Sequence, residues 1–406
     1  MKTLASAFLT VLCVAAVSQA KDFNVDNARD IRAAMAAAQA GDTIVIKPGE
    51  YDMGQALVTG HSGTQDKPIV MRAAGDKGYA KLKITGAGSD VGFRVNSRFW
   101  VLRGLHIEGN NAIKDLLMVS APSGGGDLAM VDCKVSKCSE FLIKASRSRE
   151  KGPDNVILEH CEWFDCPETA IDLVCGDNWI IRGNYVHDWG SGGGAHYGMF
   201  LKGGGKNGII EGNIADGRAG RGTVGISFGG GLTGKQWLPL AADGKVAPEH
   251  TAGICRNNIV VNTGDCAFHT NNASGCKFYG NLAYNCGAGF QRQASYPPDA
   301  ALANNVLSGN LKGPGKSENN LTKVDKAWFV APDQFDFRLT EAGKVALAGK
   351  GTALADNPTD FFGSRRKAGA PQDLGPVNAD ARESTKWVDH RATGIPASTP
   401  KTTPSP

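Results

Sequence analysis

A segment that recurs about every two dozen residues constrains the fold of this chain more than any other feature. Short segments with alternating apolar positions align in one register, and each ends in a landmark residue. The landmarks are Cys133, Cys161, Asn184, Asn213, Asn258, Asn281 and Asn305. Their spacings are 28, 23, 29, 45, 23 and 24 residues. A period near 23 with occasional insertions is typical of a solenoid, in which each coil packs on its neighbours.

Two columns of the repeat predict how the coils stack. The first holds large apolar groups and one thiol, and we expect it to face inward: Leu102, Met130, Leu158, Ile181, Ile210, Cys255, Phe278 and Leu302. The landmark column is rich in Asn, whose side-chain amides can bond along the axis at the strand spacing of about 4.8 Å. Asn also tolerates the left-handed backbone of a sharp turn. These features predict an all-β, single-stranded, right-handed parallel β-helix.

The two ends of the chain break the period. We expect residues 21–325 to form the β-helix, with a helix over Asp30–Gln39 that caps its first coil. Residues 326–395 should form an irregular C-terminal wrap, and residues 396–406, which are rich in Pro, Thr and Ser, should be disordered. Leu232–Glu249 reads as a long loop that could line a groove.

The first twenty residues have the pattern of a signal peptide. Lys2 precedes an apolar stretch from Leu4 to Val17, and Ser18-Gln19-Ala20 is a small-residue cleavage site. No later segment reaches the roughly 18 apolar residues of a membrane span. We therefore expect a secreted or periplasmic protein without a membrane span.

The net charge and the cysteines indicate which ligands and cross-links to expect. The 44 Lys and Arg residues against 40 Asp and Glu residues give a net charge of +4, so a nucleic-acid partner is not expected. We expect a monomer. Nine cysteines follow the leader, so at least one is unpaired. Cys133 stacks over Cys161 and Cys138 over Cys166, but the pairing stays open. The C-x4-C spacings do not predict a zinc site.

Three stretches resemble a known family. Gly41-Asp-Thr-Ile-Val-Ile-Lys-Pro-Gly-Glu-Tyr51, followed by Lys67-Pro-Ile-Val-Met-Arg-Ala73, resembles the opening of the chondroitinase B and alginate lyase group, polysaccharide lyase family six. Phe337-Arg-Leu-Thr340 and Asp360-Phe-Phe-Gly363 resemble the C-terminal wrap of many exported β-helix proteins. Gly198-Met-Phe-Leu-Lys202, with the Asn207–Asn213 segment after it, is similar to the family's catalytic segment.

The resemblance implies a role for Lys202. In the family this Lys is the base that removes the proton α to the uronate carboxylate. The position that matches the family's partner Arg is Gly229 in this chain. The family's metal-binding carboxylates have no match, so no metal ligands are predicted, and a Ca²⁺ requirement stays open.

Strand alternation surrounds Lys202 with candidate residues. Met199 and Leu201 should point inward, so Phe200 and Lys202 point outward. Outward columns run through Asp172, Phe200, Ser227, His269 and Gln291, and through Lys202 and Asn271. β-Elimination needs a base, a group that neutralises the carboxylate and an acid for the leaving oxygen. We assign these roles to Lys202, to Arg221, and to Tyr197 or His269, with substrate binding by Arg218, Phe200, Asn271 and Gln291.

Other functions fit the same fold. The favoured reading is a lyase acting on an anionic, uronate-containing polysaccharide, and a C5-epimerase would share the proton abstraction. A glycoside hydrolase needs two carboxylates about 5–10 Å apart, and Asp172 is the one acidic residue in the outward columns. In a non-catalytic carbohydrate-binding or cell-surface protein, Lys202 and the arginines would only hold an anionic glycan. An outward Lys is also commonly a solvated surface charge.

Overall fold

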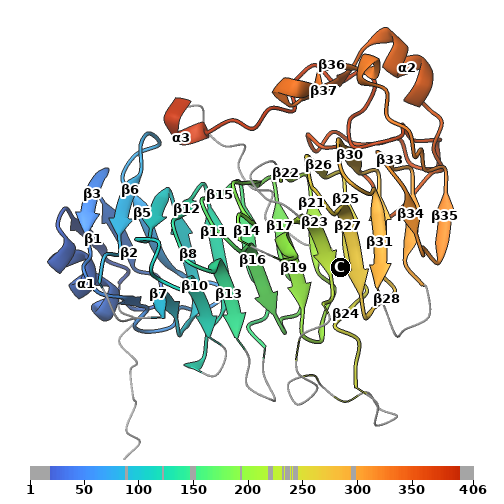
Figure 1. The fold of residues 1–406 in the computed structure, drawn as a ribbon. Helices are drawn as coiled ribbons and strands as arrows, with labels where there is room; N and C mark the ends of the chain where they lie inside the picture. The colour runs from blue at the N-terminus through green and yellow to red at the C-terminus, as the bar shows by residue number, and fades with distance from the viewer. Residues whose placement is uncertain are drawn as a thin grey trace, which may run out of the picture.

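The computed structural model shows three parallel β-sheets wound into one elongated solenoid (Figure 1). The structure describes residues 19–86, 90–120, 123–146, 152–192, 194–217, 223–230, 233, 238, 240, 246–293 and 299–393. Residues 1–18 of the predicted signal peptide, the 396–406 tail and most of the 232–249 loop lie outside these residues. Within the described part, no helix is long and apolar enough to cross a membrane.

Apart from the first and last strands of sheet A, each coil contributes one strand to each sheet, in the order A, B, C along the chain. Sheet A is β1 (Asp22–Val25), β2 (Thr43–Ile46), β5 (Ile69–Ala73), β8 (Arg98–Arg103), β11 (Gly126–Val131), β14 (Ile157–Glu159), β17 (Ile180–Arg182), β21 (Ile209–Glu211), β25 (Ile254–Arg256), β29 (Lys277–Tyr279), β32 (Ala301–Ala303) and β35 (Lys316–Glu318). Sheet B is β3 (Gly49–Asp52), β6 (Ala80–Lys83), β9 (Leu105–Glu108), β12 (Lys134–Ser136), β15 (Glu162–Phe164), β18 (Tyr185–His187), β22 (Ile214–Asp216), β26 (Ile259–Val261), β30 (Leu282–Tyr284) and β33 (Val306–Leu307).

Sheet C carries the candidate site. Its strands are β4 (Leu57–Val58), β7 (Val91–Val95), β10 (Asp115–Ser120), β13 (Phe141–Ser146), β16 (Thr169–Val174), β19 (His196–Lys202), β23 (Thr223–Phe228), β27 (Cys266–Asn271), β31 (Phe290–Gln293) and β34 (Leu311–Lys312). A short sheet beside it joins β20 (Gly205–Lys206), β24 (His250–Thr251) and β28 (Ala273–Ser274).

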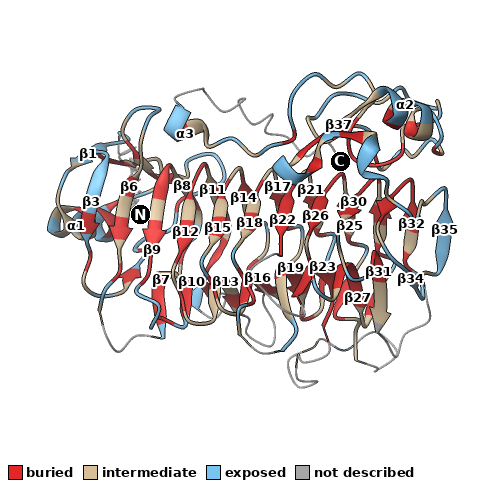
Figure 2. Ribbon diagram, turned by 45° about the horizontal axis from the view of Figure 1, so that its top comes forward, coloured by how far each residue is buried: buried red, intermediate tan, exposed pale blue. Residues whose placement is uncertain are grey.

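The predicted inward column forms the core of sheet A. Each of its side chains pairs in register with the next, and all eight are buried. In Figure 2 the buried positions follow the strands of the solenoid, whereas β35 at the last coil is exposed. Each coil thus covers the apolar side chains of the coil before it, which removes them from water.

The landmark asparagines form the expected ladder at the corner between sheets A and B. The backbone N–H and the Nδ2 of Asn184 both donate to Oδ1 of Asn213, at 2.9 and 3.0 Å. The same pair of bonds repeats along the column from Asn213 through Asn258, Asn281 and Asn305 to Asn320. Every rung is buried as far as Asn305, so the ladder satisfies polar groups that water does not reach.

The left-handed backbone lies one residue earlier than the sequence predicts. The residues with positive φ at this corner precede the ladder: His160, Gly183, Gly212, Asn257, Gly280 and Asn304. The ladder residue itself follows the bend, because only there does its amide point inward at the next coil.

Thiols continue the column into the earlier coils, where the chain has Cys instead of Asn. The N–H of Cys133 donates to Sγ of Cys161 at 3.4 Å. At the next corner of the same coils, after the strands of sheet B, the Sγ atoms of Cys138 and Cys166 lie 3.3 Å apart. The stacking predicted for both pairs is confirmed.

A helix covers the first coil of the solenoid, and the C-terminal segment packs along its side. Helix α1 (Ala28–Ala37) begins at Asn27, whose side chain accepts the N–H of Asp30, and it buries Ile31 and Met35 against the first coil. The C-terminal wrap comprises η3 (Lys326–Trp328), β36 (Phe329–Ala331), η4 (Pro332–Gln334), β37 (Asp336–Leu339), α2 (Glu341–Leu347) and α3 (His390–Thr393). Figure 1 shows the wrap turning back along the solenoid, so that α3 returns to the early coils.

Removing one rung should destabilise the fold strongly. Asn213→Ala leaves the Asn184 N–H and the Ile181 carbonyl without their partner in a buried site. At about 1–3 kcal/mol for each orphaned group, we expect the free energy of unfolding to fall by about 2–5 kcal/mol in urea titrations followed by circular dichroism. The control is Asn207→Gly, because Asn207 is exposed and has a φ of 58° that glycine adopts freely. Equal losses in both variants would contradict a buried ladder.

Candidate active site

The outward face of sheet C presents the predicted columns in register. Pairing between neighbouring strands places the following side chains in one row: Arg94, Met118, Lys144, Asp172, Phe200, Ser227, His269, Gln291 and Lys312. Lys202 pairs with Val174 in the adjacent row. The facing predicted by alternation is therefore confirmed.

Lys202 lies beside Asp172, and a second lysine lies on the other side of that carboxylate. Lys202 Nζ is 3.4 Å from Asp172 Oδ1, and Lys144 Nζ is 4.0 Å from Asp172 Oδ2. The Lys202 side chain is 16% exposed and that of Asp172 only 3%. Two ammonium groups therefore share one buried carboxylate.

Sequence reasoning missed Lys144. This residue stands one coil before Asp172 in the same row, paired with it across β13 and β16. Extending the outward column back by one coil would have found it.

Tyr197 is adjacent to Lys202 through the ring of Phe200. The Tyr197 and Phe200 rings stack with their centroids 4.0 Å apart, and Lys202 Nζ is 4.4 Å from the Phe200 centroid. Burial raises the pKa of Tyr197 to about 12, so its hydroxyl stays protonated at neutral pH. Tyr197 thus has the protonation state of a proton donor.

Phe200 does not offer a surface for substrate. It is only 5% exposed, and a Cβ placed on Gly230 would lie 2.2 Å from its ring. Because Tyr197 and the Gly230 backbone pack against it, Phe200 supports the neighbouring side chains. Its expected role in substrate binding is corrected to a packing role.

His269 is unsuited to the role of a cationic acid. Its Nδ1 lies 2.9 Å from Oγ of Ser227, and both side chains are buried. Burial lowers the pKa of His269 to about 4, so the imidazole is neutral at pH 7. Of the two residues expected to supply the acid, the structure favours Tyr197.

Two further buried carboxyl groups lie near the lysines. Burial raises the pKa of Asp115 from its ordinary value of 3.8 to about 6, against the opposing charges of Lys144 and Lys114. Burial also raises the pKa of Glu249, although Lys202 counteracts part of this effect. Glu249 accepts the Gly203 N–H at 2.9 Å. Neither carboxyl belongs to an aligned column, which is why the repeat pattern did not reveal them.

The position that matches the family's partner Arg cannot supply a positive charge in this chain, because it is Gly229. Gly229 has a φ of 76°, and a Cβ there would lie 2.1 Å from the Asn271 carbonyl oxygen. No longer side chain fits this backbone. Arg218 and Arg221, to which substrate binding and neutralisation were assigned, lie outside the described residues.

Asn271 and Gln291 are half-buried residues farther along the face. Asn271 lies two strands beyond Lys202, and Gln291 lies three strands beyond Phe200. Gln291 donates to Oδ1 of Asp265 at 3.0 Å. Their roles in substrate binding stay predictions. In the part of the chain that the structure describes, no group of three or more His, Cys, Asp or Glu side chains is arranged to hold a metal ion.

Comparison with known proteins establishes the family. The model of the right-handed β-helix region matches residues 103–314, which is more than half of the chain. The chain belongs to the right-handed β-helix family. The resemblance inferred from the sequence is thereby confirmed at the level of the fold. No curated protein sequence matches it significantly.

Several solved β-helix structures are similar to this β-helix protein. Pectate lyase Pel9A is 15% identical with a TM-score of 0.55, over 90% of this chain and 98% of its own. A PL6 family polysaccharide lyase from Pseudopedobacter saltans is 15% identical with a TM-score of 0.40, over 79% and 96%. An alginate lyase from Paenibacillus sp. is 18% identical with a TM-score of 0.39, over 75% and 99%. At these identities, the likeness to Pel9A shows a shared fold.

The raised pKa of Asp115 gives a testable pH dependence. The folded state holds a proton up to about pH 6, whereas the unfolded chain releases it near 3.8, so folding weakens as the pH rises through this window. Above pH 6, Asp115→Asn should therefore be more stable than the wild type by about 1–3 kcal/mol, which a higher melting temperature would show. Near pH 4 the two proteins should melt at the same temperature. The exposed Asp66→Asn variant serves as the control. A difference that does not change with pH would refute the shift.

Proposed function

We propose that the protein is an exported polysaccharide lyase that cleaves a uronate-containing glycan by β-elimination on the outward face of sheet C. The observation that carries the proposal is the cluster of Lys144, Asp172 and Lys202, with the Phe200 ring between Lys202 and the Tyr197 ring. Export rests on the signal-peptide pattern of residues 1–20. The family supplies the fold, on which lyases are one of several activities.

The two neighbouring lysines on the outward face favour an anionic substrate. Lys144 is the better candidate to neutralise the uronate carboxylate, because its side chain is 27% exposed and its distance to Asp172 is the longer of the two. Holding that carboxylate stabilises the negative charge that develops when the C5 proton leaves.

Lys202 is the proposed base. Asp172 keeps a cationic neighbour in Lys144 when Lys202 releases its proton to solvent before the reaction. The neutral amine then takes the C5 proton, the electron pair forms the C4–C5 double bond, and the C4–O bond breaks. The Asp172 contact holds Nζ in position before the reaction.

Tyr197 is the proposed acid. Its hydroxyl remains protonated well above neutral pH, so it can give a proton to the leaving glycosidic oxygen. A hydrolase is less well supported, because Asp172 is enclosed and shared between two lysines. An epimerase would use the same base but return the proton to C5.

The first test is the absorbance near 235 nm of the unsaturated product. We expect it to rise on at least one of alginate, pectate, chondroitin, dermatan and heparin-like chains, assayed with and without calcium. Lys202→Ala should lower the rate by about 10²–10⁴-fold, the usual contribution of a general base. Lys206→Ala is the matched control, because that lysine is 59% exposed and pairs with Asp177.

Other products would decide between the alternatives. Deuterium uptake at C5 without absorbance would indicate an epimerase, and new reducing ends without absorbance would indicate a hydrolase. Binding without any product would indicate a non-catalytic protein. Lys202→Ala activity equal to that of the wild type would refute the proposed base.

A separate pair of variants tests the acid. Tyr197→Phe keeps the ring that stacks on Phe200 but removes the proton, so kcat should fall by about 10²-fold or more with KM little changed. His269→Gln should keep kcat within about threefold, because the neutral imidazole takes no part in the step. The reverse order of effects, measured as initial rates at 235 nm, would assign the acid to His269.

A further inference from the structure

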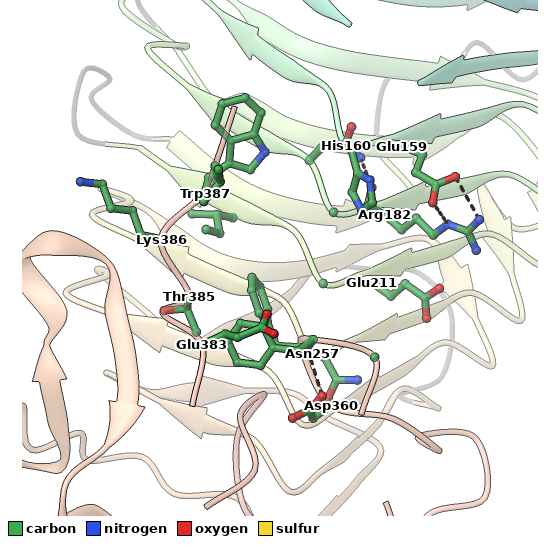
Figure 3. Close-up of a pocket in the computed structure, with 18 of the residues that line it drawn as sticks. Glu159, His160, Arg182, Glu211, Asn257, Asp360, Glu383, Thr385, Lys386 and Trp387 are labelled. Atoms are coloured by element: carbon green, nitrogen blue, oxygen red, sulfur yellow. Dashed lines mark hydrogen bonds and ion pairs between the residues drawn. The ribbon is translucent and has the colours of Figure 1, made fainter. Parts of the chain in front are cut away.

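A cavity of about 560 Å³ lies at the corner between sheets A and B, away from the outward face of sheet C. The turns between β14 and β15, β17 and β18, and β21 and β22 form one wall. Two segments of the C-terminal wrap, residues 359–363 and 383–390, form the other (Figure 3). The volume falls within the range of about 300–1,000 Å³ typical of pockets for small ligands.

One wall is a strap, residues 385–389, that is fastened at both ends. At one end, Oγ1 of Thr385 accepts the Phe337 N–H at 2.8 Å. At the other end, Asp389 accepts the Tyr79 hydroxyl at 2.7 Å and pairs with Lys134 Nζ at 2.7 Å. The strap therefore bridges several coils without lying flat on them, and the cavity is preformed beneath it.

Trp387 stands at the middle of the strap and lines the cavity. Its ring stacks on Tyr185 with centroids 5.7 Å apart and planes 30° apart, and the residue is only partly buried. The two fastened ends and this stacking fix an aromatic surface at the cavity wall. Such a surface suits the apolar face of a sugar ring.

Two carboxylates that line the cavity are paired with arginines. Glu159 lies 3.0 Å from Arg182, which also lines the cavity, and Glu211 lies 2.6 Å from Arg256, which is not a lining residue. Asp360 accepts backbone N–H groups of its own turn. Because Arg182 is already paired, these groups offer no free cation to an anionic ligand, whereas the hydroxyls of a neutral sugar find both donors and acceptors.

The remaining ionisable groups support the same ligand class. Glu383 and Lys386 of the wrap are exposed and of opposite sign. Burial lowers the pKa of His160, which leaves its imidazole neutral at pH 7. Glu159, Arg182 and Glu211 lie on successive coils, so acceptors and a donor alternate along the wall at the coil spacing of about 4.8 Å.

We propose that this cavity binds a neutral oligosaccharide, with Trp387 stacking on a sugar ring and with the Arg182–Glu159 pair and Glu211 binding hydroxyl groups. The site is separate from the proposed catalytic face in position and in charge preference. It does not depend on whether sheet C cleaves a uronate chain.

Isothermal titration of the full mature chain with cellohexaose, mannohexaose, laminarihexaose and chitohexaose tests the site. We expect at least one to bind, and Trp387→Ala to weaken it about tenfold or more. Because Trp387 also packs on Tyr185, Trp387→Phe is a second variant that keeps an aromatic ring in place and should weaken binding less. Unchanged melting temperatures would show that the variants fold.

Two controls separate this site from the catalytic face. Lys202→Ala should leave neutral-chain binding unchanged, and so should Trp328→Ala, which removes a tryptophan of the wrap that does not line the cavity. The proposal is overturned if none of the four chains binds. It is equally overturned if binding survives Trp387→Ala or is lost in Lys202→Ala.

Discussion

The hydrogen bonds that join one coil's asparagine to the next fix how the coils from Asn184 to Asn320 align. Each rung joins a backbone N–H and an amide to the same Oδ1 in a place that water does not reach. A shift of one residue between coils would break both bonds and send the inward side chains outward. The ladder therefore fixes the register, and the register fixes the rows of functional side chains on the outer faces.

The outward face of sheet C follows from that register. Lys144, Asp172 and Phe200 come from three different coils and lie in one row only because their strands pair in step. Once in the row, burial governs their chemistry. Burial keeps the Tyr197 hydroxyl protonated, whereas it keeps the His269 imidazole neutral. At pH 7 Tyr197 therefore has an acidic proton to give, and His269 does not carry the extra proton of an imidazolium.

The sequence predicts features that repeat and misses those that do not. The inward column, the ladder and the outward facing of Lys202 follow from period and alternation, and the structure confirms each. Lys144 belongs to the repeat but lay one coil beyond the part that was aligned. Glu249 and Asp115 lie outside the columns, and their raised pKa values come from burial that no spacing encodes. The packing of Phe200 under Gly230 is likewise set by a loop.

The strap, like Glu249 and Asp115, depends on contacts that the repeat does not encode. The sequence of residues 385–389 does not predict what they contact, because Asp389 binds Tyr79 and Lys134, which lie more than two hundred residues away in the chain. Such contacts form only where the early coils are stacked beside the wrap. A rigid stack of coils thus supports two kinds of surface: a row of charges held by strand pairing, and a cavity held open by a segment tied at both ends.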